Sequence, residues 1–164
     1  MLTEEKIKTP NEVIQAFKNV PSDSAFLSAF SIASVSKQKI ARYYLRELEI
    51  AGAGENAETV PNYDTNSVNL EHVLPTTPDS AWLKLFTEDE MRSYQKRIGN
   101  LAIMSSKLNS TIGNGCFEEK KEHYKESAFL FTKEIATEDT WSKDSIDNRQ
   151  RKMAEVAVKH WSIG

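Results

Sequence analysis

Glu71-His72-Val73-Leu74-Pro75 decides the fold of this chain, together with Gly99-Asn100-Leu101 downstream and Asn109 nine residues beyond Asn100. An acidic residue joined to a histidine, followed by two asparagines, supplies the polar groups that a single-metal phosphodiesterase needs. Phosphodiester hydrolysis requires a water made nucleophilic and a cation that neutralises the charge building on the phosphate. This stretch therefore indicates nuclease chemistry.

Each of these residues has a role that follows from its chemistry. A neutral imidazole with a pKa near ~6.5 can take a proton from water at neutral pH, so His72 is the expected general base. Magnesium prefers oxygen ligands and keeps several waters, so the Glu71 carboxylate and the Asn109 amide oxygen are sufficient protein ligands. Asn100 is expected to bridge the backbone and fix the loop that aims His72. Asn114, five residues past Asn109, is the alternative ligand.

Each piece alone also has an ordinary structural explanation. A single histidine at a strand end is usually a hydrogen-bonded surface or interior residue. Asn100 directly after Gly99 fits a turn or a helix stop, and Asn109 fits the solvated face of a helix. It is the combination of the four positions that favours the functional interpretation.

The combination resembles the HNH nucleases of the ββα-metal fold, and within them the C-terminal nuclease domain of GmrSD-type restriction systems. The resemblance covers roughly residues 36–161. That family has an acidic-His-(Ile/Val)-x-Pro strand end, a Gly-Asn-Leu strand, an asparagine or histidine nine residues later, and a Phe-x-x-Lys helix. Here those elements read Glu71-His72-Val73-Leu74-Pro75, Gly99-Asn100-Leu101, Asn109 and Phe117-Glu118-Glu119-Lys120.

The resemblance implies His72 as general base, Glu71 and Asn109 as ligands of Mg²⁺ or Mn²⁺, and Asn100 as the orienting, catalytic asparagine. The sequence departs from the wider superfamily in having Glu71 where aspartate is commoner and Asn109 where histidine is commoner. Many HNH nucleases also hold a structural zinc with paired Cys-x-x-Cys motifs. This chain has one cysteine and cannot build that site.

The expected fold class is α+β and mostly α-helical, with a helical bundle around a small ββα-metal (HNH) core. At 164 residues the chain is expected to form one nuclease domain, residues 1–164. Its expected parts are a helical N-terminal part (1–51), the ββα-metal core with a helical insert (67–125), and C-terminal helices (126–164).

Capping and periodicity place the individual elements. Strands are expected at Val68–Leu70, ending or twisting at the Glu71-His72 pair before Pro75, and at Asn100–Met104. One helix is expected to begin at the Thr9-Pro10-Glu12 capping box, a short one to carry Phe26 and Phe30, and a longer one to run from about Ser36 until Gly52 and Gly54 stop it. Another is expected from the Thr87–Glu90 capping box through Ile98 to Gly99, and the next after a cap at Ser105 or Ser106. Two further helices are expected to span Phe117–Glu126 and to start at a cap at Asp144.

The charge balance argues against a strong, non-specific DNA-binding protein. The net charge is −3 and the pI is near 5.7, whereas affinity for phosphates rises with the number of Lys and Arg contacts. Local clusters such as Lys96-Arg97 and the residues Lys107, Lys120 and Lys121 are expected to contact phosphate, although each also fits a solvated helix face. DNA is the expected substrate, and a nucleotide-hydrolysing, DNA-sensing N-terminal domain or subunit, which the resemblance implies, is the expected partner.

Two other functions fit the same residues. One is a non-catalytic helical module that binds nucleic acid or another subunit of a restriction complex, and the other is a ribonuclease, because RNA presents the same phosphodiester. The favoured role is the effector of a restriction or anti-phage defence system. No 18-residue apolar run or signal peptide is present, and the single cysteine fits a reducing compartment, so a cytoplasmic protein without membrane contact is expected.

Overall fold

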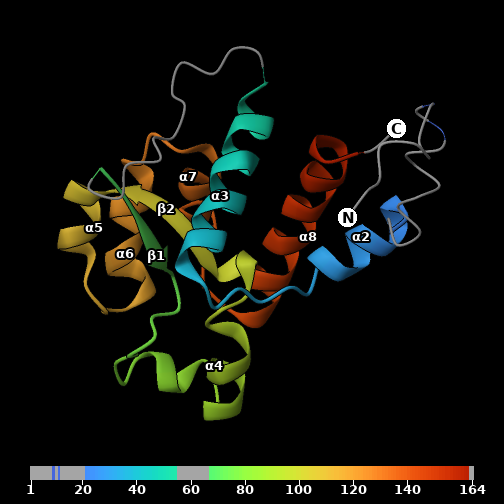
Figure 1. Cartoon of the computed structure of the whole chain (residues 1–164). Coiled ribbons are helices and arrows are strands. Elements are labelled where there is room, and N and C mark those ends of the chain that lie inside the picture. The colour runs from blue at the N-terminus through green and yellow to red at the C-terminus, as the bar shows by residue number, and fades with distance from the viewer. Residues whose placement is uncertain (1–8, 10, 12–20, 55–66, 163–164) are drawn as a thin grey trace.

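The computed structural model describes residues 9, 11, 21–54 and 67–162, and within these the fold is α+β and mostly helical. Its centre is a two-stranded antiparallel sheet of β1 (Val68–His72) and β2 (Leu101–Ser105). Figure 1 shows α5 and α6 to the left of this strand pair and α3 and α8 to its right. The helix expected from the Thr9-Pro10-Glu12 capping box lies outside the described residues.

The register of the strand pair places the two halves of the diagnostic sequence side by side. Pairing runs from Val68 opposite Ser105 to His72 opposite Leu101, so Glu71 lies opposite Ala102. Successive side chains of a strand point to opposite faces. Because β1 ends at His72, the strand ends at the Glu71-His72 pair as the sequence requires, three residues before Pro75.

The strand pair separates two hydrophobic clusters. Ala102 and Met104 pack on one face with buried residues of α5, α6 and the insert, including Ile112, Phe117 and Trp82. The alternate residues of β2 pack on the other face with α3, α8 and part of α2; this second cluster includes Leu101, Ile103, Leu45, Leu48, Met153, Ala157 and Phe30. The alternation of a strand thus accounts for a sheet that is covered on both faces.

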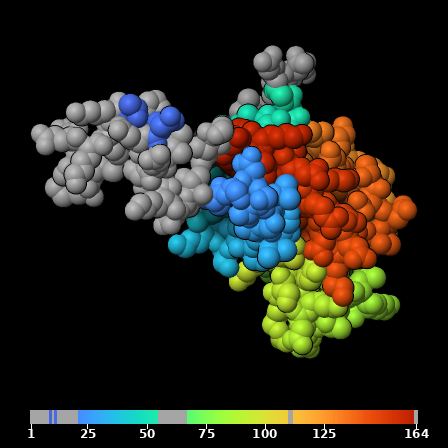
Figure 2. Space-filling view, turned by 90° about the vertical axis from the view of Figure 1, so that its right-hand side faces the viewer, coloured from blue at the N-terminus to red at the C-terminus, as the bar shows by residue number. Residues whose placement is uncertain are grey.

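The helices α2 and α3 come before the strand pair in the chain. α2 (Asp23–Phe30) begins after Ser22, whose hydroxyl accepts from the Ala25 amide, and α3 (Gln38–Ala53) is the expected longer helix. Of the two glycines expected to stop α3, Gly52 lies inside the helix, and the helix ends at Gly54, where φ is +62°. That backbone region is easily adopted by glycine, which explains the stop. In Figure 2, α2 lies beside α8 on the facing surface, and the insert forms the lower lobe.

The insert between the strands contains η2 (Trp82–Lys84), α4 (Glu88–Tyr94) and η3 (Ile98–Asn100). The predicted capping box is present: the Thr87 amide donates to the Glu90 carboxylate, and the Glu90 amide donates to the Thr87 hydroxyl. The prediction that this helix continues to Ile98 is wrong. Ile98 packs in the cluster with α3 and α8, whereas Met91 of α4 packs in the other, so the chain must leave the helix between them.

The strand pair is followed by α5 (Ser106–Ile112), α6 (Phe117–Lys125), α7 (Leu130–Ile135) and α8 (Lys143–His160). Ser105 caps α5, as one of the two expected caps. The cap of α8 is Ser142 rather than Asp144; Ser142 forms a reciprocal pair with Ser145, and Asp144 lies in the first turn. No helix within the described ranges has the length and apolar character needed to cross a membrane.

Candidate active site

His72 lies at the end of β1 with its main chain held on both sides. The His72 carbonyl accepts a hydrogen bond from the Lys120 ammonium at 2.9 Å, and the next amide, of Val73, donates to the Asn100 carbonyl at 3.0 Å. The imidazole is half-buried, and within the described ranges no residue forms a hydrogen bond with either ring nitrogen. The ring therefore has its basic nitrogen available.

The electrostatic surroundings of His72 keep its ring neutral. Burial lowers the pKa of the imidazole below its ordinary value of 6.5, and the positive charges of Lys120 and Lys96 lower it further. A neutral imidazole at pH 7 can accept a proton from water. The candidate base is thus in the protonation state that the chemistry requires.

Asn100 fixes the loop that follows His72. Its side-chain oxygen accepts from the Leu74 amide at 2.8 Å and from the Trp141 indole at 3.0 Å. Its side-chain nitrogen donates to the Leu74 carbonyl and to the Gln95 carbonyl, both at 3.0 Å. The residue is fully buried and all four hydrogen-bonding positions of its amide are used. The bridge to the backbone expected from the sequence is present.

Glu71 is the acidic member of the site and lies in the interior. Its Oε1 accepts from Lys120 Nζ at 2.7 Å and from the Tyr124 hydroxyl at 3.1 Å. Burial raises the pKa of the Glu71 carboxyl, and the Lys120 ammonium acts against this by favouring the ionised form. Lys120 and Tyr124 are one turn apart on α6, so one helix face provides both partners.

Asn109 lies on α5, which packs against both strands. Within the residues that the structure describes, its side-chain oxygen is buried and has no hydrogen-bond partner. Buried polar atoms in proteins are almost always paired, so this amide oxygen retains its capacity to accept a ligand. Asn114, the alternative ligand, is exposed in the turn after α5.

The oxygen donors at this site fit a hard divalent cation. Mg²⁺ takes oxygen ligands and retains waters, and both the unpaired oxygen of Asn109 and the carboxylate of Glu71 are donors of that kind. Over the part of the chain that the structure describes, no cluster of three or more His, Cys, Asp and Glu side chains is placed to hold a metal. A cation bound by Glu71 and Asn109 would therefore depend on water for its remaining ligands.

Among the lysines expected to contact phosphate, Lys120 lies in the interior instead of on the surface. Lys120 is fully buried with its ammonium on Glu71 and His72, so the expectation of a DNA contact at Lys120 is corrected: a group enclosed by protein cannot reach a phosphate. Lys121 donates to the Glu138 carbonyl at 2.6 Å, and Lys107 is exposed in the first turn of α5.

Comparison with known proteins gives the family. Residues 20–156 match the family described as GmrSD restriction endonucleases, C-terminal domain. The chain belongs to this family. It is therefore a nuclease domain of the restriction-endonuclease type. No curated protein matches the chain.

Several residues that support the candidate site of this GmrSD-type domain were not predicted from the motif of Glu71-His72, Asn100 and Asn109. Trp141 binds Asn100, and the Gln95 side chain donates to the Pro75 carbonyl at 3.0 Å, so both secure the loop after His72. The four-residue spacing of Lys120 and Tyr124 on a predicted helix is the signal that identifies their shared face. Lys96, whose charge acts on His72, is exposed next to Gln95.

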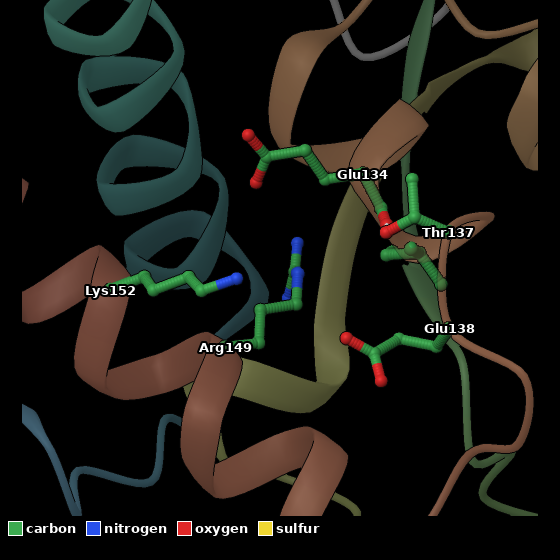
Figure 3. Close-up of a pocket in the computed structure, with 6 residues that line it drawn as sticks. Glu134, Thr137, Glu138, Arg149 and Lys152 are labelled. Carbon is green, nitrogen blue, oxygen red and sulfur yellow. The ribbon is translucent and has the colours of Figure 1, made fainter.

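A cavity of about 240 Å³ lies elsewhere in the GmrSD-type domain, between α7 and α8. Figure 3 shows Glu134 and Glu138 facing the Arg149 side chain from one side and Lys152 from the other. None of the expected site residues lines it. The Arg149 guanidinium is already hydrogen-bonded to protein, since it donates to the Gly99 and Leu101 carbonyls at 2.6 and 2.9 Å. The cavity carries as many carboxylates as cations, so it favours neither an anion nor a metal.

Proposed function

We propose that this domain is a metal-dependent HNH endonuclease that hydrolyses DNA phosphodiester bonds, and that it is the effector of a restriction or anti-phage defence system. The observation that carries the proposal is the state of His72: a neutral imidazole without a hydrogen-bond partner, held by main-chain contacts, in a restriction-endonuclease domain. The chain order of β1, β2 and α5 supports the proposal, because a ββα-metal core would consist of two strands followed by a helix.

In this mechanism His72 removes a proton from the attacking water. Lowering the imidazole pKa below its ordinary value weakens the base but increases the fraction of the ring that is neutral at pH 7, which is the form that accepts a proton. Asn100 does not touch the reacting atoms; it holds Leu74 and so sets the direction of the chain as it leaves His72. Precise placement of a base matters because a small displacement of the reacting groups slows the chemical step.

Glu71 and Asn109 would hold Mg²⁺ or Mn²⁺ in this proposal. The bound cation supplies neutralisation of the charge that develops on the phosphate and on the departing oxygen. The Glu71 carboxylate has lone pairs beyond those used by Lys120 and Tyr124, and the Asn109 oxygen has both of its own. Neither residue takes or gives a proton.

DNA is the proposed substrate, and the exposed side chains of Lys96 and Lys107 are proposed to contact its phosphates. With a net charge of −3, the domain is expected to bind DNA weakly by itself. A partner that recognises DNA, such as the nucleotide-hydrolysing N-terminal domain or subunit implied by the family resemblance, would supply the targeting.

The test is a plasmid-nicking assay with Mg²⁺, with Mn²⁺ and with excess EDTA. The expected result is slow nicking that requires the cation and falls by roughly 100-fold or more in His72→Ala. His123→Ala, on α6, is the matched control and is expected to nick at the wild-type rate. Equal cleavage with and without EDTA would exclude the metal mechanism. Parallel assays on duplex RNA separate the nuclease from a ribonuclease, and Mn²⁺ calorimetry on His72→Ala checks that the base is not a ligand.

A further inference from the structure

The peptide unit that joins His72 to Val73 is bound at both of its polar atoms. Its carbonyl oxygen accepts from Lys120 Nζ at 2.9 Å, and its N–H donates to the Asn100 carbonyl at 3.0 Å. Asn100 directly precedes β2, whereas Lys120 lies on α6. Two distant parts of the chain therefore fix the plane of the peptide from which the candidate base projects.

Lys120 is unusual in being completely enclosed. Lysine is rarely buried without a partner, because an ammonium removed from water must be paired or hydrogen-bonded. Here the ammonium has two acceptors, the Glu71 carboxylate at 2.7 Å and the His72 carbonyl. The Glu71 carboxylate alone would neutralise the charge of the ammonium. The hydrogen bond to the His72 carbonyl is therefore an additional contact, which charge pairing does not require.

The His72 ring depends on its main chain for orientation. Within the ranges that the structure describes, no side chain or backbone group forms a hydrogen bond with the imidazole. Many catalytic histidines are oriented by a bond to their second ring nitrogen, and that device is absent at this site. What remains is the direction of the Cα–Cβ bond, which the flanking peptide determines, and the packing of the half-buried ring.

We propose that Lys120 is a positioning residue for His72, acting through the His72 carbonyl rather than through the charge of Glu71 alone. This inference rests on the proposed function of His72 as general base. It gives Lys120 a part in the reaction without any contact with DNA or water. Loss of the ammonium frees one end of the His72–Val73 peptide and lets the ring depart from its productive direction.

Tyr124 provides a matched control on the same helix. Its hydroxyl binds the same Glu71 oxygen as Lys120, at 3.1 Å, but no hydrogen bond joins it to His72. Tyr124→Phe therefore perturbs the buried carboxylate and leaves the His72 carbonyl bound. Lys120→Met perturbs both. Lys120→Met also removes a charge that lowers the pKa of His72, so the variants are compared at alkaline pH, where the ring is neutral in both. A difference at His72 under that condition isolates the carbonyl contact.

The experiment compares histidine ring signals in metal-free protein by ¹H–¹³C NMR, with kinetics on DNA in Mg²⁺. The chain has three histidines, and His72→Ala identifies the signal of His72. In Lys120→Met the His72 signal is expected to shift and broaden while those of His123 and His160 stay in place. The signal is expected to remain in place in Tyr124→Phe. In the kinetics, kcat of Lys120→Met is expected to fall roughly 10- to 100-fold with KM for DNA unchanged.

A second pair of variants covers the case in which Lys120→Met does not fold, because that change leaves a buried carboxylate without its cation. Glu71→Gln/Lys120→Met contains neither buried charge, whereas in Glu71→Gln the Lys120 ammonium keeps the His72 carbonyl and the new amide oxygen as acceptors. Both variants are compared by the same ring signals. A His72 signal that is identical in these two variants overturns the inference. Cleavage that survives in His72→Ala overturns the proposed function instead, whatever the ring signals show, so the two failures are distinguishable.

Discussion

Asn100 binds both polar atoms of the Leu74 main chain. Its side-chain oxygen accepts from the Leu74 amide at 2.8 Å, and its side-chain nitrogen donates to the Leu74 carbonyl at 3.0 Å. A neighbouring strand would pair with a backbone N–H and C=O in the same way, but here a single amide side chain does so, two residues after β1 has ended. The main chain of the loop after His72 therefore has the same hydrogen bonds as a residue within a sheet.

The first prediction is that Asn100→Asp destabilises the fold and lowers kcat. A carboxylate cannot donate, so the new oxygen would face the Leu74 and Gln95 carbonyls inside the protein. Leaving buried acceptors unpaired is expected to lower the free energy of unfolding by about 2–4 kcal/mol. Denaturant unfolding measures this change. Asn114→Asp, at an exposed turn, is the control and is expected to stay within about 0.5 kcal/mol of the wild type.

The second prediction concerns the unpaired oxygen of Asn109. Asn109→Ala is expected to weaken Mn²⁺ binding and nicking together, with no loss of stability, because the removed oxygen has no partner to lose. Asn109→Asp keeps an oxygen at the same reach and adds charge, so metal affinity is expected to survive or rise. Calorimetric Mn²⁺ titration is the measurement. Unchanged affinity in the alanine variant would move the ligand to Asn114.

The third prediction is the pH dependence of cleavage. Burial and the charges of Lys120 and Lys96 lower the pKa of His72, so the acid limb of kcat/KM is expected below pH 6.5. Lys96→Gln removes one of these charges, and the limb is expected to move to higher pH. Lys159→Gln, an exposed lysine at the far end of α8, is the control whose limb should not move. A limb that stays in place in Lys96→Gln would mean that another group limits the rate.

The fourth prediction concerns stability rather than catalysis. Glu49 is buried and accepts the amides of Leu130 and Phe131 at the start of α7, and burial raises the pKa of its carboxyl from 4.5 to about 7. Between these values the folded state binds more protons than the unfolded state. The free energy of unfolding is therefore expected to fall as pH rises from 4.5 to about 7, by on the order of 3 kcal/mol.

Glu49→Gln is expected to flatten the stability profile over that window, because the amide does not titrate. Thermal unfolding followed at several pH values measures the slope. Glu88→Gln, at an exposed site in the first turn of α4, is the control and is expected to keep the wild-type slope. A Glu49→Gln profile as steep as that of the wild type would assign the proton uptake to another group.

The strands and several helix caps could be predicted because each depends on local sequence. Thr87 and Glu90 cap a helix from three residues apart, and Ser105 ends a strand and begins α5. The conformational preferences of these residues need no knowledge of the rest of the chain. The Asn100 bridge spans 26 positions and was expected from the chemistry of the site and the family resemblance rather than from local preference.

The parts that sequence could not provide depend on contacts between distant residues. The sequence around Lys120 predicts a surface lysine, because its partner Glu71 on β1 is 49 positions away in the chain. Ile98 fits the apolar side of α4, yet tertiary packing places it across the sheet. α7 is a six-residue helix whose first turn is held by Glu49, 81 positions before Leu130, so no local pattern predicts it.

The insert between β1 and β2 has a consequence for how the domain matures. His72 meets Leu101 only after residues 73–100 have closed into a loop, whereas a tight hairpin would pair its strands early. Closing a long loop costs conformational entropy before any contact is gained, and such non-local pairing forms slowly. A newly made or partly unfolded chain thus contains every residue of the site without the site itself. The candidate site is therefore assembled only once the insert between the strands has folded.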